Sequence, residues 1–278
     1  MLQSHNFAPP TDLLPFVRQF FVFNAALPAD LVLVDRLISE SAMIRVLLKG
    51  DWSARFGDDS AWQSEGPSLL FGANGRSFGV RVAGPFTVVG VAIRPSGWAA
   101  LFDCKASETA DRMFALSELW GGAADALFEH CAAASDDAGI IAAVETVVRM
   151  RLAAVGSYAS DPAMAAFEQI ARDDSTMRVA DAADRIGVSG RALERHCCAT
   201  FGLTPKVILR RSRFLDMAAA VRGISDPDED ERAALRFSDQ SHLNREFQHF
   251  IGMTPGHFER AQTPLLNAVL KLRQDGLS

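Results

Sequence analysis

Short apolar runs separated by turn-forming residues fill the first third of the chain. Between residues 30 and 95 the runs LVLVDRLIS, MIRVLLKG, SLLFGA, FGVRVAG and FTVVGVAIRP alternate with Gly, Asp, Asn and Ser. This spacing predicts strands joined by tight turns, and the run PFVRQFFVF at residues 15–23 predicts one more strand. We expect a small antiparallel barrel or sandwich, a shape that often closes around a small ligand.

Beyond Pro95 the chain becomes rich in alanine. Its apolar residues recur three and four positions apart over residues 116–134 and 140–155, a spacing that predicts two helices. At Ser160, Asp161 and Pro162 a capping residue precedes a proline at the first helical position, which predicts a third helix that ends at about residue 173. We expect this helix to connect two domains.

The C-terminal part contains an internal repeat. Residues 189–210 align with residues 239–260 at an offset of 50 residues, with six identities in 22 positions. The apolar positions are shared even where the residues differ, as when Phe201 aligns with Ile251. Two segments with one pattern predict one shape that is used twice.

The first copy of the repeat indicates what that shape is. An apolar stripe from Val179 to Ile186 is interrupted at Gly187, and a second stripe runs from Leu193 to Phe201. Gly187 suits a left-handed turn, and Ser189 can cap the helix that follows it. The pattern is that of a helix-turn-helix, which places its second helix in the major groove of DNA.

Helical spacing separates inward from outward positions on the second helix of each copy. The inward residues are small or apolar, and the outward residues are mostly polar. The base-contact candidates are Arg191, Glu194 and Arg195 in the first copy and Gln240, Ser241, Asn244 and Arg245 in the second. Arg can pair bidentately with guanine, and Asn or Gln can pair with adenine.

A basic strip lies between the two copies. Thr204 and Pro205 are expected to cap a helix that reaches about residue 221 and carries several basic side chains. Contacts from such a strip to phosphates give position and salt-dependent affinity but no sequence choice. The phosphate-contact candidates are Ser189, Lys206, Arg210, Arg211 and His242.

These motifs resemble the C-terminal DNA-binding domain of the AraC/XylS transcription regulators. The resemblance is carried by VADAADRIGVSGRALERHC, FGLTPKVILRRSRF and RFSDQSHLNREFQHFIGMTPGHFER, which begin at Val179, Phe201 and Arg236. It implies two helix-turn-helix units joined by a long helix, with the base-contact candidates facing two successive major grooves about one helical turn apart. In the N-terminal half, VLLKGDW and GVAIRPSGW resemble the barrel-type sensor domains that are fused to such regulators.

One position departs from the family pattern. Arg236 and Phe237 stand where the family usually has Gly-Phe before the second recognition helix. Arg takes a left-handed conformation less readily than Gly. The sequence therefore predicts an altered turn in the second unit.

Length, charge and cysteine content narrow the picture further. The 278 residues suit about two domains, and the net charge of −6 requires any nucleic-acid contact to be local. Residues 172–278 are the less acidic part, with 16 basic and 15 acidic side chains. The four cysteines form no CxxC pair, and neither a basic leader nor a run of 18 apolar residues is present. We expect a cytoplasmic protein that does not contact a membrane.

Two other classes of function compete with this one. A barrel enzyme with a metal site needs clustered histidines, but no histidine lies between His5 and His130. The carboxylates of the strand-rich region also lack a paired spacing, so we expect no catalytic residue, no metal and no cofactor. The other alternative is an interaction protein whose helix-turn-helix units bind a protein partner, which would depend little on Arg195, Arg245 and salt.

The sequence thus predicts an α+β protein of two domains. Residues 1–158 form an antiparallel β-barrel or cupin-like sensor and dimerisation domain with trailing helices, 159–174 a connector helix, and 175–278 an all-α domain of two helix-turn-helix units joined by a linker helix. The expected function is sequence-specific transcription regulation, as activator or repressor, under the control of a small molecule. Candidate partners are double-stranded DNA, a small-molecule effector, a second copy of the chain and RNA polymerase.

Overall fold

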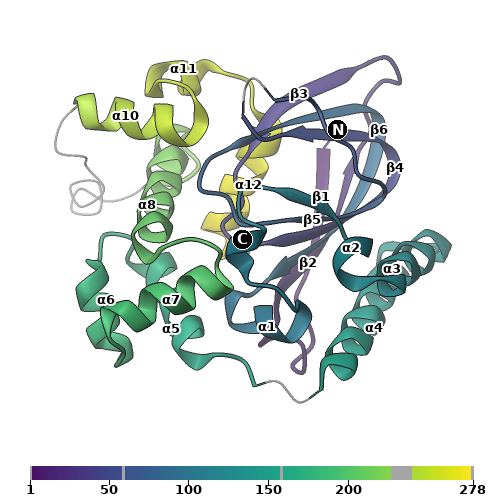
Figure 1. Cartoon of the computed structure of the whole chain (residues 1–278). Helices are drawn as coiled ribbons and strands as arrows, with labels where there is room; N and C mark the ends of the chain where they lie inside the picture. Colours follow the sequence, from purple (N-terminus) through teal and green to yellow (C-terminus); the bar gives the residue numbers. More distant parts are fainter. Residues whose placement is uncertain (1, 58–59, 157–158, 227–239, 277–278) are drawn as a thin grey trace.

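A computed structural model describes residues 2–57, 60–156, 159–226 and 240–276. The N-terminal part is one antiparallel sheet with helices against it, and the C-terminal part is helical (Figure 1). The strands are β1 (Leu2–Phe7), β2 (Val17–Ala25), β3 (Val32–Leu37), β4 (Met43–Arg55), β5 (Ser68–Phe71), β6 (Phe78–Ile93) and β7 (Met113–Ala115). The predicted fold class, an antiparallel β domain followed by an all-α domain, is confirmed.

Strand β6 organises the sheet. Its first half pairs with β3 and its second half with β2, while β4 runs along its other side. Two separately predicted strands merge in β6, because Gly84 at φ 63° and Pro85 bend the chain without ending the pairing. In the described part of the chain β1 and β7 end the sheet and do not pair with each other, so the curved sheet remains open.

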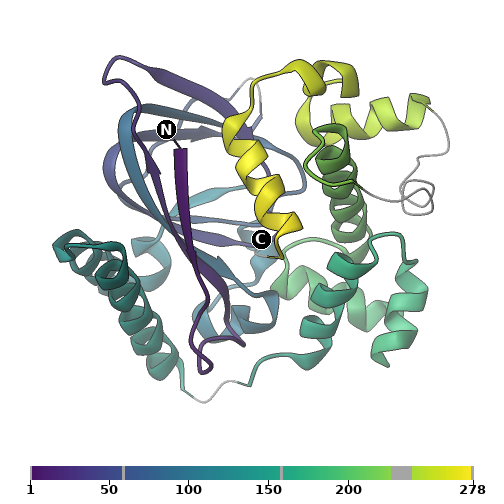
Figure 2. The same cartoon turned by 180° about the vertical axis from the view of Figure 1, so that it is seen from behind.

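The helices follow in three groups. Beside the sheet lie the short helices η1 (Pro95–Gly97), α1 (Trp98–Leu101), η2 (Ala106–Glu108) and α2 (Ser117–Trp120), and the longer α3 (Gly122–Ala133) and α4 (Asp137–Val155). The C-terminal part holds α5 (Pro162–Asp173), α6 (Val179–Ile186), α7 (Gly190–Thr200), α8 (Pro205–Val221), α10 (Gln240–Ile251) and α11 (Pro255–Arg260). The last helix, α12 (Pro264–Gln274), returns to the sheet (Figure 2).

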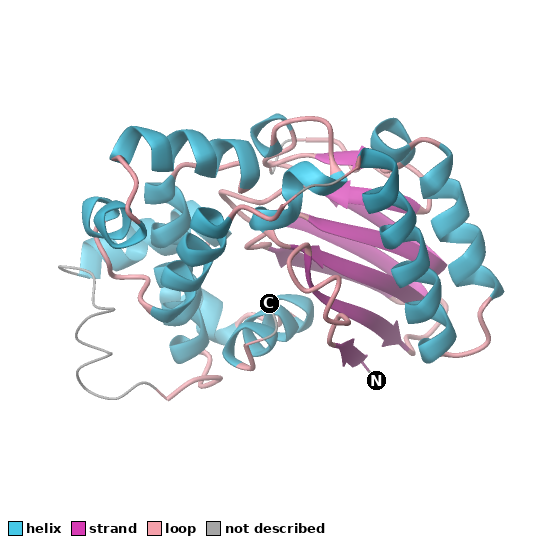
Figure 3. Ribbon diagram, turned by 90° about the horizontal axis from the view of Figure 1, so that it is seen from below, coloured by secondary structure: helices cyan, strands magenta, loops and turns pink. Residues whose placement is uncertain are grey.

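Each face of the sheet has its own hydrophobic core. Helices α3 and α4 cover one face (Figure 3), where sheet residues such as Ile44 and Val91 share a core with Leu127 and Val144 of the helices. The opposite, concave face carries an aromatic core that α12 closes with Leu265. The same helix turns Leu266 toward α8 and α10, so it joins the sheet to the helical part.

Several local predictions are confirmed and some are corrected. The side chain of Asp161 accepts from the backbone N–H groups of Ala163 and Met164, as expected of the cap of α5. Pro205 begins α8, but the Thr204 side chain makes no capping hydrogen bond. Strands β1 and β7 and helix α12 were not predicted. Among the described helices, none is long and apolar enough to cross a membrane.

Candidate nucleic-acid interface

The first helix-turn-helix unit consists of α6, a tight turn and α7. Gly187 ends α6 in the left-handed conformation at φ 79°, and Ser189 Oγ accepts from the backbone N–H of Ala192 at 3.2 Å to begin α7. Ala182 and Leu193 are fully buried between the two helices. Each of these local features follows from the sequence pattern, because glycine tolerates the turn and serine satisfies a free N–H group of the helix.

The base-contact candidates of α7 lie on its solvent-exposed face. The side chains of Arg191, Glu194 and Arg195 are exposed, while the neighbouring Cys197 is fully buried against α5. Burial raises the pKa of the Cys197 thiol well above its usual range, so this cysteine packs as an apolar group. The polar face of α7 is therefore free for a ligand outside the chain.

The second unit repeats the shape after its recognition helix. Gly252 at φ 68° matches Gly202 at φ 81°, and Thr254 Oγ1 accepts from the N–H of His257 at 3.3 Å to begin α11. Phe247 is fully buried in the core beneath α10. The predicted altered turn at Arg236 and Phe237 lies outside the described residues.

The base-contact candidates of α10 differ in how exposed their side chains are. Ser241 and Arg245 are exposed, and Asn244 is half-buried. Gln240 begins the helix, and its side chain lies outside the described part. Helices α7 and α10 lie on the same side of the molecule with α8 between them (Figure 1).

Helix α8 holds the second recognition helix in place. Arg210 donates two hydrogen bonds of 2.7 Å to the carboxylate of the buried Glu246 on α10. His242 Nε2 lies 3.5 Å from the same carboxylate. Arg210 and His242, both expected at phosphates, thus contact a partner within the protein, whereas Lys206 is exposed at the start of α8. Ser189, another phosphate candidate, uses its hydroxyl oxygen as the cap of α7.

The prediction of a phosphate contact at Arg211 needs correction. Its side chain is only 1% exposed, and it points into the N-terminal part. The guanidinium donates to the carbonyl oxygens of Asn74 at 2.9 Å and Ser39 at 3.2 Å, and also to that of Glu40. The basic spacing along α8 did not distinguish a solvent-facing arginine from one that anchors a second domain.

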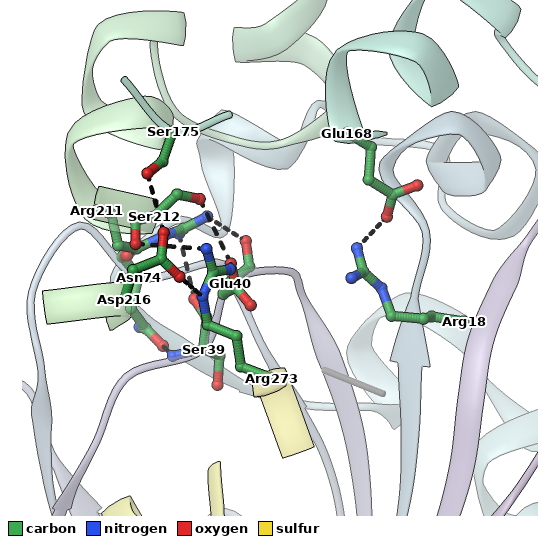
Figure 4. A network of polar contacts seen from close by, with 10 residues as sticks. All are labelled: Arg18, Ser39, Glu40, Asn74, Glu168, Ser175, Arg211, Ser212, Asp216 and Arg273. Carbon is green, nitrogen blue, oxygen red and sulfur yellow. Dashed lines mark hydrogen bonds and ion pairs between the residues drawn. The ribbon is translucent and has the colours of Figure 1, made fainter. Parts of the chain in front are cut away.

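Arg211 belongs to a polar network that joins the two parts of the chain (Figure 4). Arg273 of α12 contacts the carboxylates of both Glu40 and Asp216, the latter at 2.7 Å. Ser175 Oγ donates to Asp216 at 2.9 Å. The segment after β3, the residues before α6, helix α8 and helix α12 are therefore held together by charged and polar groups.

The charge of Glu40 is fixed by its surroundings. Burial alone would raise the pKa of this carboxyl, but attraction by arginines lowers it to about 2. These arginines, in decreasing order of effect, are Arg273, Arg18, Arg211 and Arg172. A second contact joins the domains nearby, where Glu168 of α5 pairs with Arg18 and, at 2.9 Å, with Arg94.

Sequence reasoning missed this network and helix α12. The signal for α12 was available, because Pro264 precedes Leu265, Leu266, Val269 and Leu270 at helical spacing. No local signal pairs Glu40 with Arg273, since 233 positions separate them. Within the described ranges, no group of three His, Cys, Asp or Glu side chains could hold a metal ion.

Both parts of the chain match known domain families. Residues 182–261 match a helix-turn-helix domain family, and residues 5–115 match a domain family of unknown function, DUF6597. A search of curated proteins finds no match.

Solved structures that the chain matches include ToxT from Vibrio cholerae, which shares 10% sequence identity. The match covers 93% of this chain and 97% of that chain, with a TM-score of 0.46. A ToxT structure from strain SCE256 with a bound unsaturated fatty acid shares 10% identity over 86% of this chain and 94% of that chain, with a TM-score of 0.46. The AraC-like transcriptional activator CuxR shares 12% identity over 78% of this chain and 86% of that chain, with a TM-score of 0.28.

Proposed function

The chain carries a helix-turn-helix domain of the AraC type, and from this premise we propose that it is a transcription regulator that binds double-stranded DNA at specific sequences. The expected contacts come from Arg191, Glu194 and Arg195 on α7 and from Gln240, Ser241, Asn244 and Arg245 on α10. The exposed Lys206 adds a phosphate contact. Neither a catalytic activity nor a cofactor is part of this proposal.

The equivalence of two exposed arginines carries the proposal. Arg195 and Arg245 occupy the same position of the repeat, and both side chains are exposed on helices whose opposite faces are buried. Arginine at such a position can pair bidentately with guanine in the major groove. A helix that packed only within the protein would not need a long cation at both positions.

Selection of genomic DNA fragments by the purified chain tests the proposal. We expect enrichment of a short asymmetric motif with two half-elements about ten base pairs apart. The Arg195→Ala/Arg245→Ala double variant should lose this enrichment, and Arg245→Ala alone should weaken specific binding by about 1–3 kcal/mol.

Arg81 provides the matched control, because it is an exposed arginine on strand β6 of the N-terminal sheet and not on a recognition helix. The Arg81→Ala variant should enrich the same motif as the unaltered chain. Enrichment that survives the double substitution, or equal losses on every DNA sequence, would contradict base reading by these arginines. Binding to a protein partner without any DNA selection would favour the interaction-protein alternative.

We further propose that a small molecule bound by the N-terminal domain controls DNA binding. The support is physical continuity: α12 closes the concave face of the sheet and also packs against α8 and α10. A change at that face is therefore transmitted to the helices that meet DNA. A second copy of the chain is a proposed partner because the helices of residues 116–155 could form a dimer interface, and light scattering at high protein concentration tests the homodimer. RNA polymerase is a further proposed partner.

A further inference from the structure

A small cavity lies between the concave face of the sheet and α12. Its volume is about 70 Å³, and its walls are almost wholly apolar. Phe21 and Phe86 contribute from the sheet, and Leu265 and Ala268 contribute from α12. The cavity is thus bounded by both parts of the chain.

Two side chains with hydrogen-bond donors line this cavity, and neither has an oxygen acceptor among the described residues. Arg45 and Trp52, both on β4, are each 7% exposed. In the described part of the chain no oxygen accepts from the Arg45 guanidinium, whose Nε lies 3.3 Å from Met43 Sδ. The Trp52 Nε1–H is likewise buried and has no partner among the described residues.

The register of the sheet places Arg45 beside the cavity floor. Phe21, Gly90 and Arg45 are direct neighbours across β2, β6 and β4. A Cβ atom at residue 90 would lie 1.9 Å from the Phe21 ring, so only glycine lets this ring lie flat on the sheet. The aromatic ring and the guanidinium therefore sit side by side on one face.

Aromatic rings partly compensate the charge of Arg45. Its guanidinium carbon lies 4.9 Å from the ring centroid of Trp52 and 4.8 Å from that of Phe71. Such contacts engage the face of the cation and leave its terminal N–H groups available to an oxygen acceptor. Burial lowers the pKa of Arg45 to about 10, so the group remains charged at neutral pH. A buried charge without a counter-ion is costly, and the cost falls when an anion arrives.

We propose that this cavity binds a compact organic monoanion, a carboxylate on an apolar body, with the carboxylate on the edge of Arg45 and accepting from Trp52. A planar carboxylate matches the fork of a guanidinium. One guanidinium compensates one charge, so the apolar walls disfavour a dianion such as a phosphate monoester. This inference rests on the proposed small-molecule control and names its ligand class, but it does not depend on DNA recognition.

Calorimetric titration of the full chain with matched pairs of ligands tests the inference. The probes are acetate, propanoate and butanoate, each compared with its neutral amide. We expect at least one carboxylate to bind about tenfold tighter than its amide. In Arg45→Gln this preference should disappear, and Ala268→Phe, which fills the cavity, should weaken both members of the pair.

Controls separate loss of the site from loss of the fold. Arg45→Gln removes an uncompensated charge, so its melting temperature without ligand should equal or exceed that of the unaltered chain. Trp52→Phe keeps an aromatic ring beside Arg45 and removes the N–H donor, and it should weaken carboxylate binding several-fold. The inference is overturned if none of the three carboxylates binds, or if the preference persists in Arg45→Gln. The titration contains no DNA, so its failure and failure of the DNA selection are distinguishable.

Discussion

At the scale of single residues, Asp35 shows how a buried carboxylate links α12 to the sheet. Its carboxylate accepts from the N–H of Leu265 at 2.7 Å, from that of Leu266 at 3.4 Å, and from that of Arg36 at 2.6 Å. Burial raises the pKa of Asp35 to about 6 and outweighs these hydrogen bonds, which lower it. The folded chain therefore holds a proton that the unfolded chain releases near pH 4.

This raised pKa predicts a pH-dependent stability. Between about pH 4 and pH 6 the folded state binds more protons at Asp35 than the unfolded state, so the free energy of unfolding falls as the pH rises. Asp35→Asn removes this dependence and should make the chain more stable at pH 7.5 by up to about 3 kcal/mol. Urea unfolding at pH 4.5 and pH 7.5 measures the effect, and an equal difference between the two proteins at both values would contradict it.

Arg211 and Lys206 provide a second residue-scale prediction, because both are basic residues of α8 but only Lys206 is exposed. Arg211→Met removes the hydrogen bonds that the guanidinium donates to the carbonyl oxygens of Ser39, Glu40 and Asn74, and it should destabilise the fold by about 3 kcal/mol. Lys206→Met should leave stability unchanged and reduce the salt slope of DNA binding by about one. Urea unfolding measures the stability of each variant, and DNA titration at two salt concentrations measures the salt slope of binding. A large stability loss at Lys206, or none at Arg211, would reverse these assignments.

At the scale of elements, the caps of α7 and α8 make a matched comparison. Ser189 Oγ accepts from the N–H of Ala192, whereas the Thr204 side chain makes no hydrogen bond as a cap. Ser189→Ala should therefore cost about 1 kcal/mol of stability, and Thr204→Ala much less. Thermal unfolding of the two variants measures both stability losses. Equal losses would show that the hydrogen bond from the Ala192 N–H to Ser189 Oγ does not stabilise α7.

Local signals explain which elements were predictable from the sequence. Gly187 and Ser189 determine a turn and a cap within a few residues, so the first helix-turn-helix unit and its exposed face could be predicted. The repeat extended this to Gly252 and Thr254. Strand β7 has only three residues, and its position depends on pairing with β5, which no local pattern encodes.

The candidate site was predictable to the same extent. An outward position on a helix follows from spacing, which is how the exposure of Arg191 and Arg245 could be predicted. Whether an arginine on α8 contacts solvent or the other domain depends on how the domains pack together. The prediction that Arg211 contacts phosphates was therefore wrong. Arg45 gave no signal in the sequence, because an isolated arginine in a strand is usually exposed.

At the scale of the whole molecule, the two domains meet through charges as well as apolar packing. Glu40 of the N-terminal part is surrounded by arginines that come from both parts of the chain. Arg273, which pairs with it, is 6% exposed, so the pair is shielded from water. Removing one partner from such a pair leaves the other charge buried and uncompensated, which is more costly than the pair itself.

A double-mutant cycle on this pair tests whether it couples the domains. Glu40→Gln and Arg273→Met should each destabilise the chain by about 3 kcal/mol, and the double variant should cost less than the sum by about 1–3 kcal/mol. The exposed pair of Asp12 and Arg149, at 2.7 Å, is the matched control and should show no measurable coupling. Urea unfolding provides the free energies for both cycles. Additive costs at Glu40 and Arg273 would mean that this ion pair does not couple the domains, which are then held by the Glu168 and Arg211 contacts and by the packing of α12. Strong coupling would mean that a change at the sheet alters the helical domain through this ion pair.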